Sequence, residues 1–239
     1  MLKNRLIPNI ILNNGNVVQS VNFKHTNVIG NAVTAVDFFN SWAVDEIIIL
    51  DVSRDKNYRQ TFHKIIHGLS KRCFIPLTVG GWIDSISEIR KLLQLGADKI
   101  SINTVAVENP NFINQASQIF GSQCITTSID VKKNELGKYE VMIDRGRKHT
   151  DLDPVKWAKE VEKRGAGEIF LTSIDHDGTR EGYDLNLVKS VSESISIPVI
   201  AFGGVGQWKH FVDGIKDGKA DAVSAANIFH FSEYICYQN

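Results

Sequence analysis

The sequence has no excess of charge of either sign, because 27 basic residues balance 27 acidic ones. Nucleic-acid binders usually carry a basic excess, so this balance argues against that class, although a local basic patch can still surround a phosphate. No apolar run approaches the roughly 20 residues that a membrane helix needs. Residues 1–12 lack the long apolar region and the small-residue cleavage site of a signal peptide. We therefore expect a cytoplasmic protein with no nucleic-acid partner and no membrane partner.

Cysteine is scarce as well, since the chain contains only Cys73, Cys124 and Cys236. Their spacing forms neither a CxxC pair nor a metal-ligand pattern, so we expect no metal site and no cofactor. Cys73 and Cys124 stand in or beside apolar runs, where a reduced thiol serves as a small hydrophobe. We expect both to be buried structural thiols.

What the sequence does contain is a regular alternation of short apolar runs with longer amphipathic segments. The runs predict strands at Leu6–Leu12, Glu46–Val52, Phe74–Val79, Lys99–Asn103, Cys124–Val131, Glu168–Ser173, Pro198–Phe202 and Ala222–Ala226. The segments between them predict helices at Ala32–Trp42, Ile86–Leu95, Asn111–Phe120, Pro154–Arg164, Leu185–Ser192 and Trp208–Lys216. Such alternation is typical of parallel strands covered by helices, and eight strands favour a closed barrel. The sequence thus predicts an α/β protein, a single (β/α)8 TIM barrel over residues 1–239.

The two halves of the chain resemble each other. The segments around Glu46, Pro76 and Asp98 recur around Glu168, Pro198 and Asp221, at offsets of 122, 122 and 123 residues. Chance similarity of strand–helix units is the alternative, but three matches at one spacing favour two fused half-barrels, at about 1–120 and 121–239. After the eighth predicted strand few residues remain, from Phe229 to Asn239. We therefore expect a shortened C-terminal helix.

The loops that follow the strands build the active site of such a barrel, so the residues just past each apolar run are candidates. Many of these residues are glycines or small polar residues. Glycine lets backbone N–H groups approach an anion closely, and a following helix start favours negative charge. We predict two facing phosphate-binding sites, although the glycines could serve only tight turns. The predicted phosphate-binding residues are Gly81, Asn103, Thr104, Gly178, Gly203, Gly204, Ala226 and Asn227.

Two carboxylates in these loops are candidate catalytic groups. Asp130 ends the fifth predicted strand, where its side chain points into the mouth and could act as general acid or base. The alternative for Asp130 is a salt bridge to a neighbouring lysine. Asp177 follows the sixth strand and is the second predicted catalytic residue, although it could equally position the loop at Gly178.

Charged residues stand at the opposite ends of the strands. Isolated charges inside a packed barrel would be costly, so these must pair with each other. A neutral ring of two cations and two anions meets that requirement, either as a plug that stabilises the barrel floor or as a gate for a small neutral molecule. The four residues are Arg5, Glu46, Lys99 and Glu168.

Three segments, residues 98–104, 162–169 and 172–179, closely resemble HisF, the cyclase subunit of imidazole glycerol phosphate synthase. The resemblance covers nearly the whole chain. It implies a doubly phosphorylated substrate and ammonia delivered through the barrel by a HisH-like glutaminase partner. It further implies that the four charged residues form an ammonia gate, that Asp98 lies in the glutaminase-docking face, and that Asp130 is one of two catalytic aspartates.

The chain departs from the HisF pattern inside the expected pocket. Where HisF has a catalytic aspartate at the end of the first strand, this chain has Ile11. Gln19 and Ser20 stand in place of the lysine and glycine of the first loop. Trp82 replaces the third glycine after strand three, and Phe202 replaces the serine before Gly203 and Gly204. Isoleucine cannot exchange a proton, and loss of one of two acid–base carboxylates costs a factor of about 10² to 10⁴ in rate. These changes favour a pocket that is adapted to a different substrate over an intact HisF cyclase.

The pattern is similar to the HisF paralogues of surface-polysaccharide clusters, the WbuZ group. That resemblance implies a synthase subunit that uses ammonia from a glutaminase to amidate a phosphorylated small molecule or sugar. Two alternatives stay open: a cyclase subunit of histidine biosynthesis, in which Asp130 acts alone, and a non-catalytic activator of a partner glutaminase.

Overall fold

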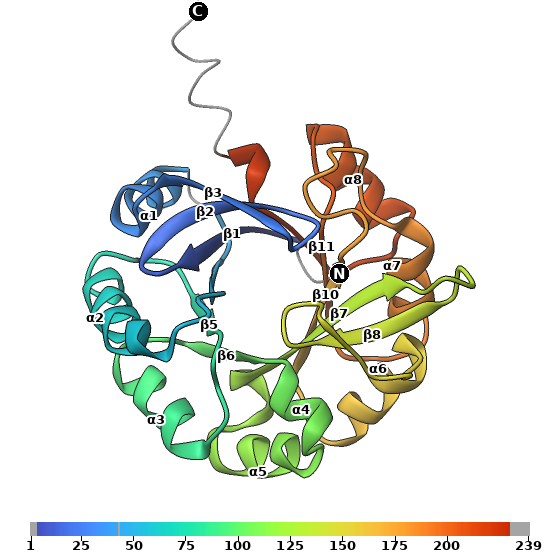
Figure 1. Cartoon of the computed structure of the whole chain (residues 1–239), viewed down its shortest axis with the longest axis horizontal. Coiled ribbons are helices and arrows are strands. Elements are labelled where there is room, and N and C mark those ends of the chain that lie inside the picture. Colours follow the sequence, from blue (N-terminus) through green and yellow to red (C-terminus); the bar gives the residue numbers. More distant parts are fainter. Residues whose placement is uncertain (1–3, 43, 230–239) are drawn as a thin grey trace, which may run out of the picture.

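Eight parallel strands close into a barrel in the computed structural model, which describes residues 4–42 and 44–229. Each strand pairs with its neighbour in the order β1, β4, β5, β6, β7, β10, β11, β12, and β12 pairs with β1 to complete the ring (Figure 1). The prediction of a single TIM barrel is therefore confirmed. The barrel strands are β1 (Arg5–Asn13), β4 (Ile47–Asp51), β5 (Leu77–Gly80), β6 (Lys99–Ile102), β7 (Ile125–Lys133), β10 (Glu168–Ser173), β11 (Val199–Phe202) and β12 (Ala222–Ala225).

Helices surround this ring and follow the strands in turn (Figure 1). Several begin at a residue that caps them: the side chains of Asn31, Ser85, Asp153 and Asp184 each accept a hydrogen bond from a backbone N–H of the first turn. The helices are α1 (Ala32–Ser41), α2 (Arg59–Ser70), α3 (Ile86–Gln94), α4 (Thr104–Glu108), α5 (Asn111–Phe120), α6 (Pro154–Lys163), α7 (Leu185–Ser192) and α8 (Trp208–Lys216), with short 3-10 turns at Lys56–Tyr58 and Ser122–Cys124.

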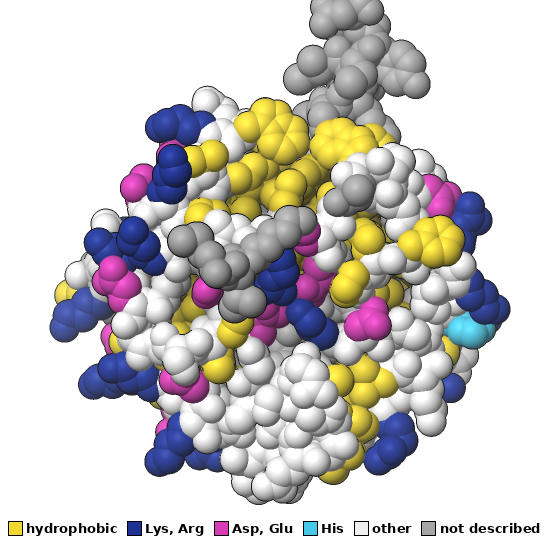
Figure 2. Space-filling view, turned by 180° about the vertical axis from the view of Figure 1, so that it is seen from behind, with side chains coloured by type: hydrophobic (Ala, Val, Ile, Leu, Met, Phe, Trp, Pro, Cys, Tyr) yellow, Lys and Arg dark blue, Asp and Glu magenta, His cyan; other side chains and the backbone are white. Residues whose placement is uncertain are grey.

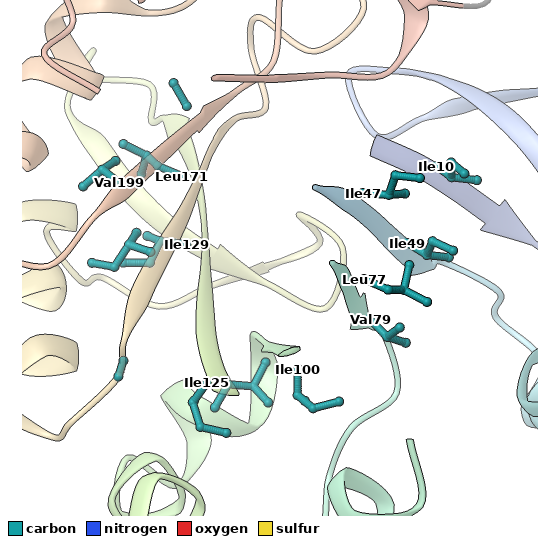
Figure 3. Packing of buried hydrophobic residues seen from close by; sticks show 14 of the residues in the cluster. Ile10, Ile47, Ile49, Leu77, Val79, Ile100, Ile125, Ile129, Leu171 and Val199 are labelled. Carbon is teal, nitrogen blue, oxygen red and sulfur yellow. The ribbon is translucent and has the colours of Figure 1, made fainter. Parts of the chain in front are cut away.

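The main core lies between the strands and the helices. Figure 3 shows aliphatic side chains on the strand faces turned toward the helices, among them Ile10, Ile49, Val79, Ile129 and Leu171. All five are at most 1% exposed, and they pack with buried helix residues in one cluster. Because successive residues of a strand point to opposite faces, the alternate positions face the barrel axis. The barrel interior is therefore a second, separate set of side chains.

Two hairpins extend the barrel at its mouth, and neither was predicted from the apolar runs. The first comprises β2 (Asn16–Val21) and β3 (His25–Gly30), and it follows β1. The second comprises β8 (Tyr139–Ile143) and β9 (Lys148–His149), and it follows β7. In the first, Asn14 and Gly15 have φ angles of 51° and 83° and form the tight turn between β1 and β2.

The same contacts recur in the two halves of the barrel. The Asp98 carboxylate accepts a hydrogen bond from the backbone N–H of Leu77 at 2.8 Å, which ties the exposed Asp98 to the start of β5. The Asp221 carboxylate accepts from the N–H of Val199 at 2.9 Å in the same way, 123 residues further on. Each aspartate thereby fixes the start of the neighbouring strand.

Three expectations need correction or fall outside the description. The third barrel strand begins at Leu77 and not at Phe74, whose side chain is 87% exposed, because the chain before Leu77 is still a surface loop. Cys73 and Cys124 are free thiols that are only half-buried, because they stand at the edges of their apolar runs. Cys236 and the shortened C-terminal helix lie outside the described residues.

Candidate functional site

A cavity of about 1150 Å³ opens at the carboxyl ends of the barrel strands. Four of the predicted site residues line it, namely Gly81, Asn103, Thr104 and Asp130. They come from the ends of β5, β6 and β7, which are neighbours in the barrel. The loops after these strands therefore form one side of the site, as expected for this fold.

Asp130, a predicted catalytic residue, is a buried carboxyl group of this cavity. Its side chain accepts hydrogen bonds from the Ser128 hydroxyl and from the Asn103 amide, both at 3.2 Å. Burial raises the pKa of Asp130 to about 6, and the charge of Asp177 adds to the rise, while the hydroxyls of Ser128 and Thr172 oppose it. A carboxyl group with a pKa near neutral can both give and take a proton under physiological conditions. The alternative of a lysine salt bridge is not what the structure holds.

Asn103 and Thr104 are held by protein contacts at the edge of the cavity. The Asn103 amide also donates to the Ser128 carbonyl at 3.1 Å, so its N–H groups point along β7. The Thr104 hydroxyl donates to the Asn103 side-chain oxygen at 3.3 Å and accepts from the Asp144 backbone N–H at 3.1 Å. These bonds join the loop after β6 to the turn of the second hairpin. Both residues stay predicted phosphate-binding groups.

The residues that depart from the HisF pattern give the cavity an apolar wall. Ile11, Trp82 and Phe202 all line it. The rings of Phe202 and Phe170 pack at 5.1 Å between centroids, which fills the part of the barrel interior below. Trp82 has a φ of 55°, a conformation that bulky residues rarely adopt, and its indole N–H donates to the Ser53 carbonyl at 2.7 Å. The cavity therefore combines two buried carboxyls, those of Asp51 and Asp130, with several large apolar side chains.

The predicted phosphate-binding residues of the second half and the predicted catalytic residue Asp177 do not line the cavity. Asp177 and Gly178 lie under the first hairpin. Asp177 is 4% exposed, and its carboxylate accepts from the Ser20 hydroxyl at 2.7 Å and from the Phe23 backbone N–H at 3.3 Å. Burial raises the pKa of Asp177, against the effect of these two donors. A Cβ on Gly178 would stand 2.8 Å from the Ser20 carbonyl oxygen, so only glycine allows this approach. The Asn227 amide donates to the same oxygen at 3.2 Å.

The remaining members of this second group also pack against protein. Gly203 and Gly204 have φ angles near +100°, and Cβ atoms there would meet the carbonyl oxygens of Ser173 and Gly182. Ala226 is buried beside them at the end of β12. The structure thus brings Gly81, Asn103, Thr104 and Asp130 together at an open cavity. Gly178 and Asn227 instead lie against the first hairpin, and Gly203 and Gly204 pack against Ser173 and Gly182.

The four charged residues predicted for the floor converge into one ring. We call Arg5, Glu46, Lys99 and Glu168 the floor ring. Arg5 donates to Glu46 at 2.9 Å and also to Glu168, and Lys99 donates to Glu46 at 2.9 Å and to Glu168 at 3.1 Å. On the face opposite to that in Figure 1, acidic and basic side chains gather near the centre (Figure 2). Each carboxylate therefore meets both cations, and the ring is neutral.

Polar side chains occupy several interior positions between the floor ring and the cavity. Register places Thr126 beside Glu168, Ser101 beside Thr126, and Ser224 beside Ile7, all on the strand faces turned to the axis. The side-chain atoms of Asn9, Ser101, Thr126 and Ser224 are buried with no hydrogen-bond partner. Such groups are costly in an apolar core, so their presence marks the interior as unusually polar.

Two further observations concern the described residues as a whole. No helix within residues 4–42 and 44–229 combines the length and the apolar character needed to cross a membrane. In the same ranges, no group of three or more His, Cys, Asp or Glu side chains is placed to hold a metal ion.

The fold and the cavity together define a TIM-barrel protein whose site lies at the carboxyl ends of the strands. Residues 5–235 match the family described as "Histidine biosynthesis protein", and the chain therefore belongs to that family, among its HisF-like members. It is similar to the "Putative imidazole glycerol phosphate synthase subunit hisF2" of Vibrio vulnificus (strain YJ016). The two are 48% identical over 234 residues, which cover 98% of this chain and 86% of that protein.

Proposed function

We propose that this chain is a synthase subunit that takes ammonia from a HisH-like glutaminase and adds it to a phosphorylated sugar. The floor ring is the observation that carries the proposal. Four charges from four strands meet at the amino ends of the barrel and neutralise one another, which closes the floor to ions. A small neutral base such as ammonia can pass such a ring when one cation moves aside.

The barrel interior supports a path from this floor to the cavity. Asn9, Ser101, Thr126 and Ser224 offer buried donors and acceptors that no protein group uses. Ammonia both donates and accepts hydrogen bonds, so it suits these groups better than an apolar molecule would. Ser101 also lines the cavity that contains Asp130. Asp130 would then accept a proton from the nitrogen, or donate one to the acceptor oxygen, when ammonia attacks the acceptor.

The altered cavity supports an acceptor other than the histidine-pathway substrate. Ile11 is 5% exposed and lines the same cavity as Asp130, so the site has an apolar residue where HisF has its second carboxylate. Trp82 and Phe202 add two large aromatic side chains to the lining of this cavity. Ammonia that attacks the carbonyl carbon of a sugar phosphate gives a carbinolamine, whose C–O bond then breaks with loss of water to leave an imine. Both steps need only proton transfers, for which one acid–base carboxyl is enough.

The histidine-pathway reaction provides the first test. We expect the purified chain, supplied with ammonium ions, to leave the absorbance of the substrate of imidazole glycerol phosphate synthase unchanged. A working HisF cyclase, run in parallel, shows that the assay detects turnover. Consumption of the substrate by this chain, or rescue of a HisF-deficient strain by its gene, would overturn the proposal.

A cyclase subunit of imidazole glycerol phosphate synthase is the second candidate, favoured by the family match and by the relative's printed name. In that case Asp130 would act alone as both acid and base. The same substrate assay separates the two candidates. If neither substrate class is consumed and the chain only speeds glutamine hydrolysis by its partner, the role is that of a glutaminase activator.

A further inference from the structure

Arg145 is a cation at the cavity that forms no direct ion pair within the part of the chain that the structure describes. It lies in the turn between β8 and β9 and lines the cavity. Its neighbour Asp144 pairs with Arg147 at 2.6 Å, and Asp51 is approached by Arg59 at 3.7 Å. No ion pair joins the Arg145 guanidinium to a carboxylate of the described residues. Burial lowers the pKa of Arg145 and the charges of Arg147 and Arg54 act in the same direction, while the nearby charges of Asp144 and Asp51 oppose the shift.

The fold holds this cation in one place. Asp144, Arg145 and Gly146 have φ angles of 50°, 58° and 73°, which turn the chain sharply over the mouth. The Asp144 N–H donates to Thr104 on one side of this turn. On the other side, a Cβ on Gly146 would stand 3.2 Å from the Phe23 ring of the first hairpin. The turn therefore spans from the loop after β6 to the first hairpin.

Trp82 supplies the surface on which Arg145 rests. The guanidinium carbon lies 4.8 Å from the centre of the Trp82 ring, and the Lys56 ammonium lies 5.3 Å from it. Trp82 keeps a left-handed backbone and a hydrogen bond to Ser53, so its ring is fixed although the conformation is unfavourable. Two cations are thus gathered at one edge of the cavity, next to Gly81.

We propose that Arg145, stacked on Trp82 and assisted by Lys56, binds a phosphoryl group of the acceptor at this edge of the cavity. The inference rests on the proposed function and adds the residues that select the acceptor. A guanidinium presents two parallel N–H groups that match two phosphate oxygens, and stacking on an aromatic ring leaves those groups free. Trp82 would at the same time fill space near Gly81, so the phosphate would bind beside the indole.

Phosphate binding to the chain alone tests this assignment. Inorganic phosphate is titrated at constant ionic strength and followed by ³¹P line broadening and by tryptophan fluorescence. We expect Arg145→Ala to weaken binding about tenfold or more, and Arg145→Lys to weaken it less, because lysine keeps the charge but loses the two-pronged geometry. Acetate should bind more weakly than phosphate to the wild-type chain.

Arg147→Ala is the matched control, because Arg147 lies in the same turn, is half-exposed and already pairs with Asp144. We expect its phosphate affinity to stay within twofold of the wild type. Equal losses in both variants, unchanged affinity in Arg145→Ala, or equal binding of acetate would overturn the proposal. An unchanged thermal unfolding midpoint shows that Arg145→Ala is folded. If that variant does not fold, Arg145→Gln takes its place in the phosphate titration.

The same experiment separates this inference from the proposed function. Lys99 belongs to the floor ring at the amino ends of the strands, whereas Arg145 lines the cavity at their carboxyl ends, so Lys99→Met should leave phosphate affinity unchanged while it alters ammonia use. Arg145→Ala should weaken phosphate binding and leave glutamine hydrolysis by the partner glutaminase unchanged. If only the Lys99→Met result differs from this expectation, ammonia transfer is contradicted. If only the Arg145→Ala result differs, the role of Arg145 is contradicted.

Discussion

Replacing Asp130 by asparagine should make the protein more stable at neutral pH. The buried carboxyl has a pKa of about 6 against an ordinary 3.8, so the folded state holds the proton more tightly than the unfolded chain does. At about 1.4 kcal/mol for each pH unit, this difference costs the folded wild type about 3 kcal/mol above pH 6. Asparagine carries no charge in either state, so the cost disappears in the variant.

The sign of the effect fixes its pH dependence. Below about pH 3 the carboxyl is protonated in both states, and the wild type and Asp130→Asn should differ little. The advantage of the variant should grow through the range from about 4 to 6 and then level off. Between pH 5 and pH 8 the expected growth is about 1.5 kcal/mol.

Urea unfolding followed by tryptophan fluorescence at several pH values measures this difference. Ile11→Val is the control, because it alters the same cavity without a titrating group, and its effect should be independent of pH. If Asp130→Asn and the wild type gave parallel stability curves from pH 5 to pH 8, burial would not raise the pKa of Asp130. The assignment of Asp130 as an acid–base group at neutral pH would then fail.

Two further substitutions test the contacts around the site. Among the described residues, Lys99→Met leaves Arg5 as the one cation that pairs with Glu46 and Glu168. The change should cost about 2–3 kcal/mol of unfolding free energy, because a buried charge loses its partner. The double variant Lys99→Met with Glu168→Gln restores neutrality and should recover at least half of this loss in urea unfolding; no recovery would contradict a coupled ring. Ser20→Ala removes a donor to the Asp177 carboxylate, so amide exchange in the first hairpin should speed up about fivefold or more, while exchange in the barrel strands stays unchanged. Uniform acceleration throughout the chain would show instead that the hairpin and the barrel open together.

The barrel could be predicted from the sequence because its strands and helices obey simple periodic patterns. Each of the eight predicted strands is present, and the helices Asn111–Phe120, Leu185–Ser192 and Trp208–Lys216 have the predicted bounds. The hairpins were missed because their strands mix polar and apolar residues, so they form no continuous apolar run. The pair Asn14–Gly15 was a usable signal for the first of them, since this dipeptide favours a tight hairpin turn.

The site divides in the same way into local and long-range features. The floor ring could be expected because charges at strand starts must neutralise one another inside a barrel. The position of the first hairpin over Gly178 could not be predicted, because it depends on a contact between Ser20 and Asp177, which lie 157 residues apart in the chain. The meeting of Arg145 with Trp82 was hidden for the same reason, as it needs both the unforeseen second hairpin and the left-handed Trp82.

Isotope tracing tests ammonia transfer through the barrel most directly. The chain and a HisH-type glutaminase from the same organism are given glutamine labelled with ¹⁵N in its amide, an excess of unlabelled ammonium ions, and a pool of sugar phosphates. Mass spectrometry should find an aminated product that carries mainly ¹⁵N, because nitrogen released by the glutaminase reaches Asp130 without mixing with the solvent. A product labelled like the ammonium bath, or glutamine hydrolysis with no aminated product, would contradict transfer through the floor ring.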